Sequence, residues 1–470
     1  MKKSFLFKIA AIILSISMLC SCTAADLDLA SDLIDSVITE LEKLPEDKAD
    51  SIASTTTSED SPISSNLDTI SDTSAKASSN SGGTVLPEVI DKDSSNQTDT
   101  DNRYPDISSE ETPVSDSSVP QTTQNNNAHK IRSYEDLKQV QYNVKTGYSY
   151  SGETITLECD IDLLGIAWQP IGTYQRPFKG KLNGNGHKIS NLTISSSMNS
   201  FADSNGQSYV GFFGCAEDAV IEGLHLENIS FELSDDGGAD FAYIGGICGF
   251  LFGRRNAISI TDCSTSGNIS VFSESNSHMD IGGILGAFDA NMGNIDYNMQ
   301  WLYSTVNIKS EGYWINSGGI SGSFAARRAL KPEFKVSDMI YKGNIDDEKV
   351  RVPRTAGIFG SYHCGATSKI ENCFVSLGVK RTGNNQYTEI DTHIGLVIGD
   401  EAASCAELSL SNIYGQVICG SSAVLQGMLG RAHSSVYFNK CFEVSQLPSD
   451  VPFDSEKWNL SDLASPVFYP

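Results

Sequence analysis

The stretch AYIGGICGFLF at 242–252 contains the string that decides the fold, a glycine, an apolar residue, any residue and a closing glycine. The copies are VGFFG (210–214), IGGICG (244–249), IGGILG (281–286), SGGISG (317–322), AGIFG (356–360), IGLVIG (394–399) and QGMLG (426–430). Their closing glycines lie 35, 37, 36, 38, 39 and 31 residues apart. A period near 36 held over seven copies predicts a stacked repeat.

Each copy is followed by a second segment that alternates apolar and polar residues and is rich in β-branched side chains, which is typical of strands. These segments are 220–231, 258–271, 301–309, 336–345, 369–379, 407–418 and 436–444. Two strands and a glycine turn per repeat fit one coil of a parallel β-solenoid. A β-propeller blade needs four strands, which 36 residues with these loops barely supply. We therefore predict an all-β fold in which stacked coils share one core.

The solenoid is expected to begin before the seven copies. Segments 155–172 and 178–194 come first. The second of them again alternates and turns at Gly184 and Gly186, which predicts at least one further coil. A helix over 134–145, opened by Ser133, is expected to cap the N-terminal end of the stack.

The motifs resemble the GLUG repeat of bacterial surface proteins, in which a Gly-Gly-aliphatic-x-Gly strand is followed by a second strand closed by Gly-x-aliphatic. GGICG with ITDCSTSGNI (245–249 and 260–269) matches this pattern almost throughout, and the similarity covers roughly residues 130–445. The resemblance implies a right-handed parallel β-helix (β-solenoid) in an extracellular setting. It implies no catalytic residues.

The first 22 residues predict a targeting segment. Three lysines precede an apolar run at 9–19, which is too short to span a bilayer comfortably. The run ends in LCSC at 19–22, which resembles the cleavage box of bacterial lipoproteins and implies acylation of Cys22. The protein is therefore expected to be lipid-anchored in the cell membrane and to face outwards. The alternative is an ordinary signal peptide cut near Ala24 or Ala25.

The rest of the chain divides into a tether, a domain and a tail. Residues 23–50 predict a short amphipathic helix, and 51–128, with 29 Ser/Thr in 78 positions, predict a disordered linker. The solenoid domain is expected over 129–447, and 448–470 form a C-terminal tail. Of the net charge of −26, the domain and tail carry −12 and residues 23–128 carry −17, while the targeting segment adds +3. Such an acidic chain is a poor ligand for nucleic acid.

Nine cysteines follow the targeting segment, and nothing in their spacing predicts a metal site or a cofactor. Cys263, Cys373 and Cys441 occupy the same place in their repeats. Equivalent positions of a solenoid point the same way, so these three are expected to be small hydrophobic side chains in an inward stack.

Numbering from the closing glycines aligns four arginines. Arg254 and Arg255 stand five and six residues after Gly249, and Arg327 and Arg328 stand at the same offsets two repeats later. A row of Phe288, Phe324 and Tyr362 stands at offset two, and at offset three stand Asp289, His363 and His433. An arginine patch beside an aromatic row is the predicted site for an anionic or sugar ligand. The alternatives are a core ladder for the rings and local ion pairs for the arginines.

No catalytic residue can be assigned. Solenoid lyases and hydrolases use clustered carboxylates, and none recurs at equivalent positions in adjacent repeats. The predicted function is a surface lipoprotein that displays a β-helix for adhesion or for binding of an extracellular glycan or surface protein. The alternative is a carbohydrate-active enzyme, a polysaccharide lyase or glycoside hydrolase, on the same scaffold.

Overall fold

The computed structural model describes residues 129–470 except 236, 238, 276, 291–295, 327–334, 365–366, 381–392, 402–406, 420–426, 433–434, 445, 448–452, 454–456, 460, 462–466 and 469–470. The predicted targeting segment, Cys22, the amphipathic helix and the linker lie outside the described residues. Residues 115–470 form one compact unit, and both core clusters of the described residues lie between Ile131 and Trp458. We therefore expect this unit to fold by itself.

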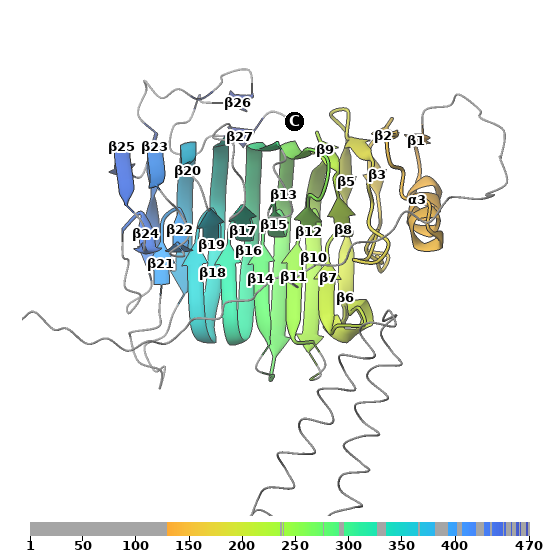
Figure 1. Ribbon diagram of the computed structural model, residues 1–470, viewed down its shortest axis with the longest axis horizontal. Helices are drawn as coiled ribbons and strands as arrows, with labels where there is room; N and C mark the ends of the chain where they lie inside the picture. Colours follow the sequence, from red (N-terminus) through yellow and green to blue (C-terminus); the bar gives the residue numbers. More distant parts are fainter. Residues whose placement is uncertain are drawn as a thin grey trace, which may run out of the picture. The chain divides into compact units, whose positions relative to one another are not determined.

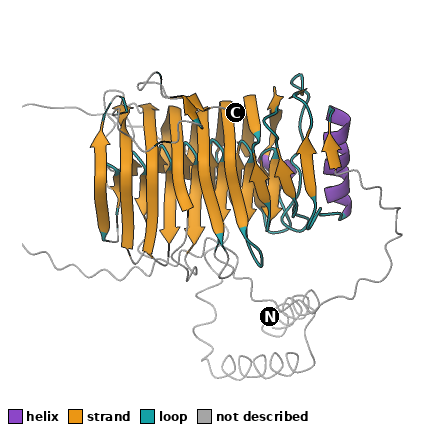
Figure 2. Cartoon of the chain, turned by 90° about the horizontal axis from the view of Figure 1, so that it is seen from above, coloured by secondary structure: helices purple, strands orange, loops and turns teal. Residues whose placement is uncertain are grey.

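The unit begins with the predicted capping helix (Figures 1 and 2). Strand β1 (His129–Ile131) leads to α3 (Tyr134–Thr146). The Ser133 hydroxyl accepts a hydrogen bond from the Asp136 N–H at 3.2 Å, which caps the first turn. Gly147 ends the helix with a φ of 108°, a left-handed conformation that suits glycine. The expectation of a helix opened by Ser133 is confirmed.

Short strands form the first coils, as the sequence predicts. They are β2 (Thr154–Leu157), β3 (Ile161–Asp162), β4 (Lys181–Asn183), β5 (Lys188–Ser190) and β6 (Thr193–Ser197), followed by the 3-10 turn η2 (Met198–Phe201). The pairings β1–β2, β2–β4 and β3–β5 are all parallel.

The seven glycine strings become one parallel sheet with a strand from each repeat (Figure 1). In order, its strands are β8 (Phe213–Glu217), β12 (Cys248–Phe252), β15 (Leu285–Asp289), β17 (Ser321–Ala326), β19 (Phe359–Cys364), β22 (Ile398–Glu401) and β24 (Leu429–Arg431). Each strand pairs with the strand of the next repeat, which is the arrangement of a β-solenoid.

The second segments of the repeats form a longer parallel sheet. Its long strands are β10 (His225–Asp235), β13 (Ile258–Ser273), β16 (Tyr297–Gly318), β18 (Lys335–Ala356), β20 (Thr367–Lys380), β23 (Glu407–Cys419) and β25 (Val436–Glu443). The same sheet includes β1 to β6 and the shorter strands β7 (Gln207–Val210), β9 (Val220–Glu222), β11 (Phe241–Gly245), β14 (His278–Gly282) and β21 (His393–Gly395). The predicted all-β, parallel β-solenoid fold is confirmed.

The closing glycines stack into one column because there is no room for a side chain. A Cβ placed on Gly286 would lie 2.5 Å from the carbonyl oxygen of Gly249, and one on Gly322 would lie 2.7 Å from that of Gly286. The same clash, at 2.3–2.8 Å, repeats along the column from Gly249 to Gly430. The repeated glycine of the sequence is therefore a requirement of backbone packing between coils.

The long strands turn a corner at equivalent positions. The residues on either side of each corner pair in register, so the left-handed corner residues align in one column: Asp262, Trp301, Asp338, Asn372, Asn412 and Lys440. Amide side chains tie part of this column together, since Asn372 donates to Asp338 at 3.1 Å and Asn412 donates to Asn372 at 3.0 Å. Asn and Asp tolerate this conformation better than other residues with side chains, which explains their frequency at the corner.

The residue after each corner points into the core, and this column contains the three matched cysteines. Register runs from Cys263 through Leu302 and Met339 to Cys373, Ile413 and Cys441. Cys263 and Cys373 are fully buried, and burial raises the pKa of both thiols far above the usual value. Cys441, in the last coil, is half-buried. The predicted inward stack is confirmed.

The predicted C-terminal tail contributes to a second core cluster on the outside of the long sheet. Phe453 and Trp458 pack with Leu447 against an outward row that includes Ile340, Phe374 and Tyr414. Lys457 pairs with Asp262, which is 195 residues earlier in the chain. Strands β26 (Trp458–Asn459) and β27 (Val467–Phe468) form an antiparallel pair.

Candidate functional site

Arg254 is held by its own neighbourhood. Its guanidinium donates to the Tyr174 hydroxyl at 3.1 Å, lies 3.9 Å from the Glu217 carboxylate and stacks on the rings of Tyr174 and Phe252. The side chain is 29 % exposed. The alternative of a local ion pair therefore describes Arg254 better than a free ligand contact does.

Of the other three arginines of the predicted patch, the structure describes one. Arg255 is exposed, and its backbone N–H donates to Asp218. Arg327 and Arg328 lie outside the described residues. Strand pairing matches Phe252 with Asp289 and Asp289 with Ala325. The alignment by offset from the closing glycines therefore agrees with the strand register as far as Phe252 and Ala325. These residues stand two positions before Arg254 and Arg327. The four-arginine patch stays a prediction.

The aromatic row expected beside the arginines is a core ladder. Phe288 stacks on Phe324 with ring centroids 5.3 Å apart, and Phe324 stacks on Tyr362 at 4.7 Å. All three rings are fully buried, as are the neighbouring side chains of Asp289 and His363. The expectation that this row lines a ligand surface is wrong, because the side chains at offset two point into the solenoid core. His433 lies outside the described residues.

Two columns of side chains that the sequence did not single out face each other across a buried corner. One runs through Tyr209, Tyr243, Asp280, Asn316, Arg354 and His393 on the long sheet. The other runs through Cys215, Phe250, Ala287, Ser323, Ser361 and Asp400 on the seven-stranded sheet. The corner is aromatic in the earlier repeats, where Tyr243 stacks on Phe250 at 5.0 Å.

In the later repeats this corner is polar and hydrogen-bonded. Asp280 accepts from Ser323 at 2.5 Å and from Asn316 at 2.6 Å. Ser361 and His363 lie within hydrogen-bond distance, 2.8 Å apart, but both are fully buried. We therefore interpret this network as structural, because no substrate could reach the serine hydroxyl in this arrangement.

The strongest part of the network is a carboxylate between two guanidinium groups. Asp400 pairs with Arg354 at 2.8 Å and with Arg431 at 2.7 and 3.1 Å. Burial alone would raise the pKa of Asp400, but the two cations outweigh burial and hold it below its usual value. Arg354 also stacks on Trp314, 4.6 Å from the ring centroid.

This pair should make the solenoid sensitive to acid. A lowered pKa stabilises the folded state above the unfolded-state pKa of about 4, and this contribution is lost as the pH falls through the folded-state value. We expect Asp400→Asn to cost about 3–5 kcal/mol at pH 7, because it leaves a buried guanidinium without its carboxylate. In denaturant titrations at pH 7 and at acidic pH, the variant should lose less stability on acidification than the wild type. Equal losses would contradict this role of Asp400.

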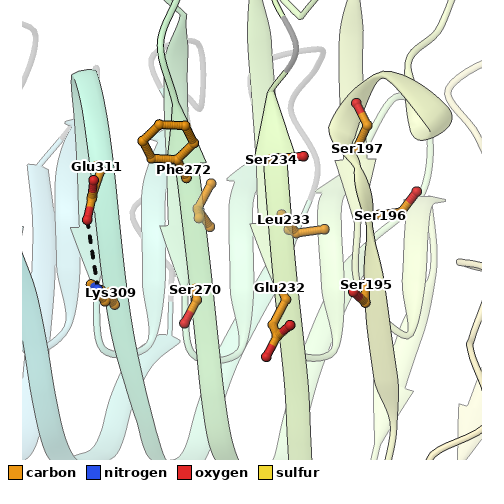
Figure 3. A pocket seen from close by; sticks show the side chains of 11 residues that line it. Ser195, Ser196, Ser197, Glu232, Leu233, Ser234, Ser270, Phe272, Lys309 and Glu311 are labelled. Carbon is orange, nitrogen blue, oxygen red and sulfur yellow. Dashed lines mark ion pairs between the residues drawn. The ribbon is translucent and has the colours of Figure 1, made fainter.

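An accessible polar surface lies on the outward side of the long sheet. We call it the open face and define it by the register row Ser195, Glu232, Ser270, Lys309, Asp346 and Lys380, one residue from each of six successive strands. All six side chains are exposed or half-buried. Five strand spacings of about 4.8 Å make the row about 24 Å long. Figure 3 shows its first four members side by side, with Ser197, Ser234, Phe272 and Glu311 in the next row.

Two shallow depressions hollow this face, and each has lining residues on β16. The first, of about 470 Å³, is lined by serines together with Glu232, Phe272, Lys309 and Glu311. The second, of about 500 Å³, includes Asn307, Asn344 and Lys380. Their walls offer hydroxyl, amide, amino and carboxylate groups along one continuous sheet surface.

Three lysines on or beside the open face lie within 4 Å of two carboxylates. Glu311 lies 3.0 Å from Lys349 and 3.8 Å from Lys309, and Asp346 lies 3.4 Å from Lys380. All three lysine side chains are at least 60 % exposed, so such pairs contribute little to stability. Their effect is local: neither sign of charge dominates the surface.

Asparagines form a parallel row beside these ion pairs. Asn307 donates to Asn268 at 3.2 Å, and Asn344 donates to Asn307 at 3.0 Å. The three side chains are exposed, and an amide row can both donate and accept further hydrogen bonds. Phe272, which is 43 % exposed, supplies an apolar surface one strand away from the row of ion pairs.

Comparisons with known proteins do not identify a family for this chain. No family model and no curated protein matches the chain. Among solved structures, one described as a putative immunoglobulin A1 protease from Bacteroides ovatus is similar, with a TM-score of 0.42 and 16 % identity over 72 % of this chain and 91 % of that chain. The resemblance to the GLUG repeat stays a prediction, and the fold rests on the strand pairing of this chain.

The described part of the chain has neither a membrane-spanning helix nor a cluster of metal ligands. None of its helices is long and apolar enough to cross a membrane. Within the same residues, no group of three or more His, Cys, Asp and Glu side chains is placed to hold a metal ion.

Proposed function

We propose that this protein is a cell-surface lipoprotein whose β-solenoid binds a neutral glycan along the open face. The observation that carries the proposal is the composition of that face: hydroxyl and amide groups in register over several strands, with ion pairs that cancel one another. A neutral sugar polymer offers many hydroxyl groups and no charge, so it matches such a surface. A strongly acidic polymer would need a surplus of cations.

The shape of the face supports an extended ligand. The depressions are shallow and follow the stacking direction of the strands, which suits a polymer chain rather than a small molecule enclosed on all sides. Phe272 could stack on the apolar face of a sugar ring, and Asn307 could exchange hydrogen bonds with its hydroxyl groups.

Binding should depend on these two side chains. Each contact is expected to contribute about 1 kcal/mol, so Phe272→Ala and Asn307→Ala should each raise Kd about fivefold. The measurement is titration of the 115–470 unit with neutral oligosaccharides identified on a glycan array. Leu164→Ala is the matched control, because Leu164 is 76 % exposed and follows β3, which lies three strands along the sheet from β13 with Phe272. Equal affinity for all variants would contradict the assignment, and release of new reducing ends would favour the alternative of an enzyme.

The anchor is a separate part of the proposal and rests on the sequence of the first 22 residues. Cys22→Ala should remove the acylation site and shift the protein from the membrane fraction to the medium, or leave it unprocessed. Fractionation of cells that express the two forms tests this. Recovery of the wild type from intact cells without detergent would contradict lipid anchoring.

A further inference from the structure

The two ends of the described solenoid differ. At the N-terminal end, α3 contributes the buried residues Leu137, Val140 and Val144 and covers the first coils (Figure 2). At the other end, within the described residues, β25 pairs with β23 and with no further strand. Among the described residues, the outer edge of β25 is therefore an open strand edge, and such edges are ready to pair with another chain.

The core continues to this open edge. One inward column runs through Met299, Val336, Ile370 and Leu410 to Phe438. The first four side chains are at most 1 % exposed, whereas Phe438 is 55 % exposed. In a solenoid, an inward side chain is normally covered by the apolar side chains of the next layer. The exposure of Phe438 therefore indicates that another apolar layer packs on it.

The outward side of the same strand is apolar as well. Phe442 stacks on Tyr414 at 6.1 Å and is 52 % exposed, and Tyr437 is 55 % exposed. All three large aromatic side chains of this eight-residue edge strand are more than half exposed, Phe438 on the inward side and Tyr437 and Phe442 on the outward side. Exposed apolar side chains gathered on one strand are typical of an interaction site.

We propose that β25 pairs with β25 of a second copy of this chain, in an antiparallel arrangement about a two-fold axis. A centre between Asn439 and Lys440 places Tyr437 opposite Phe442 of the second copy and Phe438 opposite Cys441. Tyr437 and Phe442 are exposed aromatic side chains, and Phe438 and Cys441 both belong to inward columns. The strand is therefore complementary to itself, and each inward side chain meets another inward side chain.

In a two-fold arrangement, each chain needs only one partner chain to pair the outer edge of its β25. A two-fold contact uses the same surface on both chains and closes on itself. Because the N-terminal ends carry α3, the resulting pair of solenoids has a helix at each end, and the outer edge of β25 is paired at the contact. Lys440 is exposed at the centre of the contact opposite an asparagine, so the register brings no like charges directly opposite each other.

The first test is the mass of the 115–470 unit and of the full chain, measured by sedimentation and light scattering. At concentrations up to about 100 μM, where a complex with micromolar Kd is saturated, we expect a dimer. Tyr437→Lys with Phe442→Lys places four lysines around the contact and should raise the dimer Kd at least tenfold. Tyr142→Lys is the control, because Tyr142 is 61 % exposed on α3 and should leave the mass unchanged.

The second test fixes the register. Tyr437→Cys with Phe442→Cys should give a covalent dimer under mild oxidation, because these positions face each other across the two-fold axis. Tyr437→Cys alone should not, because its opposite residue is then Phe442. A monomeric wild type, a dimer that survives the double lysine change, or equal cross-linking of both cysteine variants would overturn the proposal. A dimeric 115–470 unit with a monomeric full chain would also overturn it, since residues 1–114 would then compete for the edge.

Discussion

Replacing Gly286 with alanine should unfold the solenoid. A Cβ at this position would lie 2.4 Å from the Ile244 nitrogen and 2.5 Å from the Gly249 carbonyl oxygen. Both are backbone atoms of the neighbouring coil, so neither can move aside as a flexible side chain would. We expect a loss of at least about 3 kcal/mol, at the upper end of overpacking penalties, measured by denaturant unfolding of the 115–470 unit.

The control for this change is Gly237→Ala. Gly237 has a φ of 91°, and no atom lies within 4 Å of a Cβ built on it, so alanine meets backbone strain but no clash. Its expected cost is about 1–2 kcal/mol. If the two alanine variants were equally stable, the column of closing glycines would not be held by close packing.

Ile284→Asp should have a comparable or larger effect. Ile284 is fully buried in the main core, and its backbone N–H and carbonyl join neighbouring coils through bonds to Ile320 and Ile247. A carboxylate there meets an apolar core, which costs several kcal/mol even if the group is protonated. We expect no soluble folded protein, or loss of the cooperative transition in circular dichroism.

A suitable control adds the same charge at an exposed turn. Ser275 is unsuitable although the sequence places it in a loop, because its hydroxyl donates to the Asp235 carboxylate. Ser151→Asp, in an exposed turn before β2, should change stability by less than about 0.5 kcal/mol. Folding of both variants to the same extent would show that Ile284, between β14 and β15, does not lie in the core.

The sequence predicts the fold well because the spacing of the repeats determines which residues of neighbouring strands pair. The closing glycines recur at a nearly constant period and define the seven-stranded sheet, and the matched cysteines after the corner residues define an inward column. In a solenoid, the same offset in successive repeats leads to the same place in space, so period alone brings residues far apart in the chain together.

The sequence predicts side-chain surroundings less well. Arg254 stands at the expected offset, but its partner Tyr174 comes from a loop 80 residues earlier that belongs to no repeat. The polar corner shows the same limit, because its column changes from tyrosine to aspartate, asparagine, arginine and histidine in successive repeats. A column whose residue type changes at every step leaves no periodic signal, although strand pairing makes it continuous.

The open face was missed for a related reason. Any solvent-exposed strand carries polar residues such as serine, asparagine, lysine and glutamate at alternate positions. The sequence of a single strand therefore does not distinguish a binding surface from an ordinary exposed one. The pairing of Glu311 with lysines in its own strand and the next becomes visible only with the register of β16 and β18.

The most direct test of the central claim is the salt dependence of glycan binding by the 115–470 unit, measured on a panel that contains neutral and acidic glycans. Binding at the open face predicts recognition of a neutral glycan with a Kd that is nearly unchanged between about 0.05 and 0.5 M salt, because screening acts on net charge. Recognition of acidic glycans alone, with binding lost at high salt, would place the ligand at the arginine patch and contradict the claim.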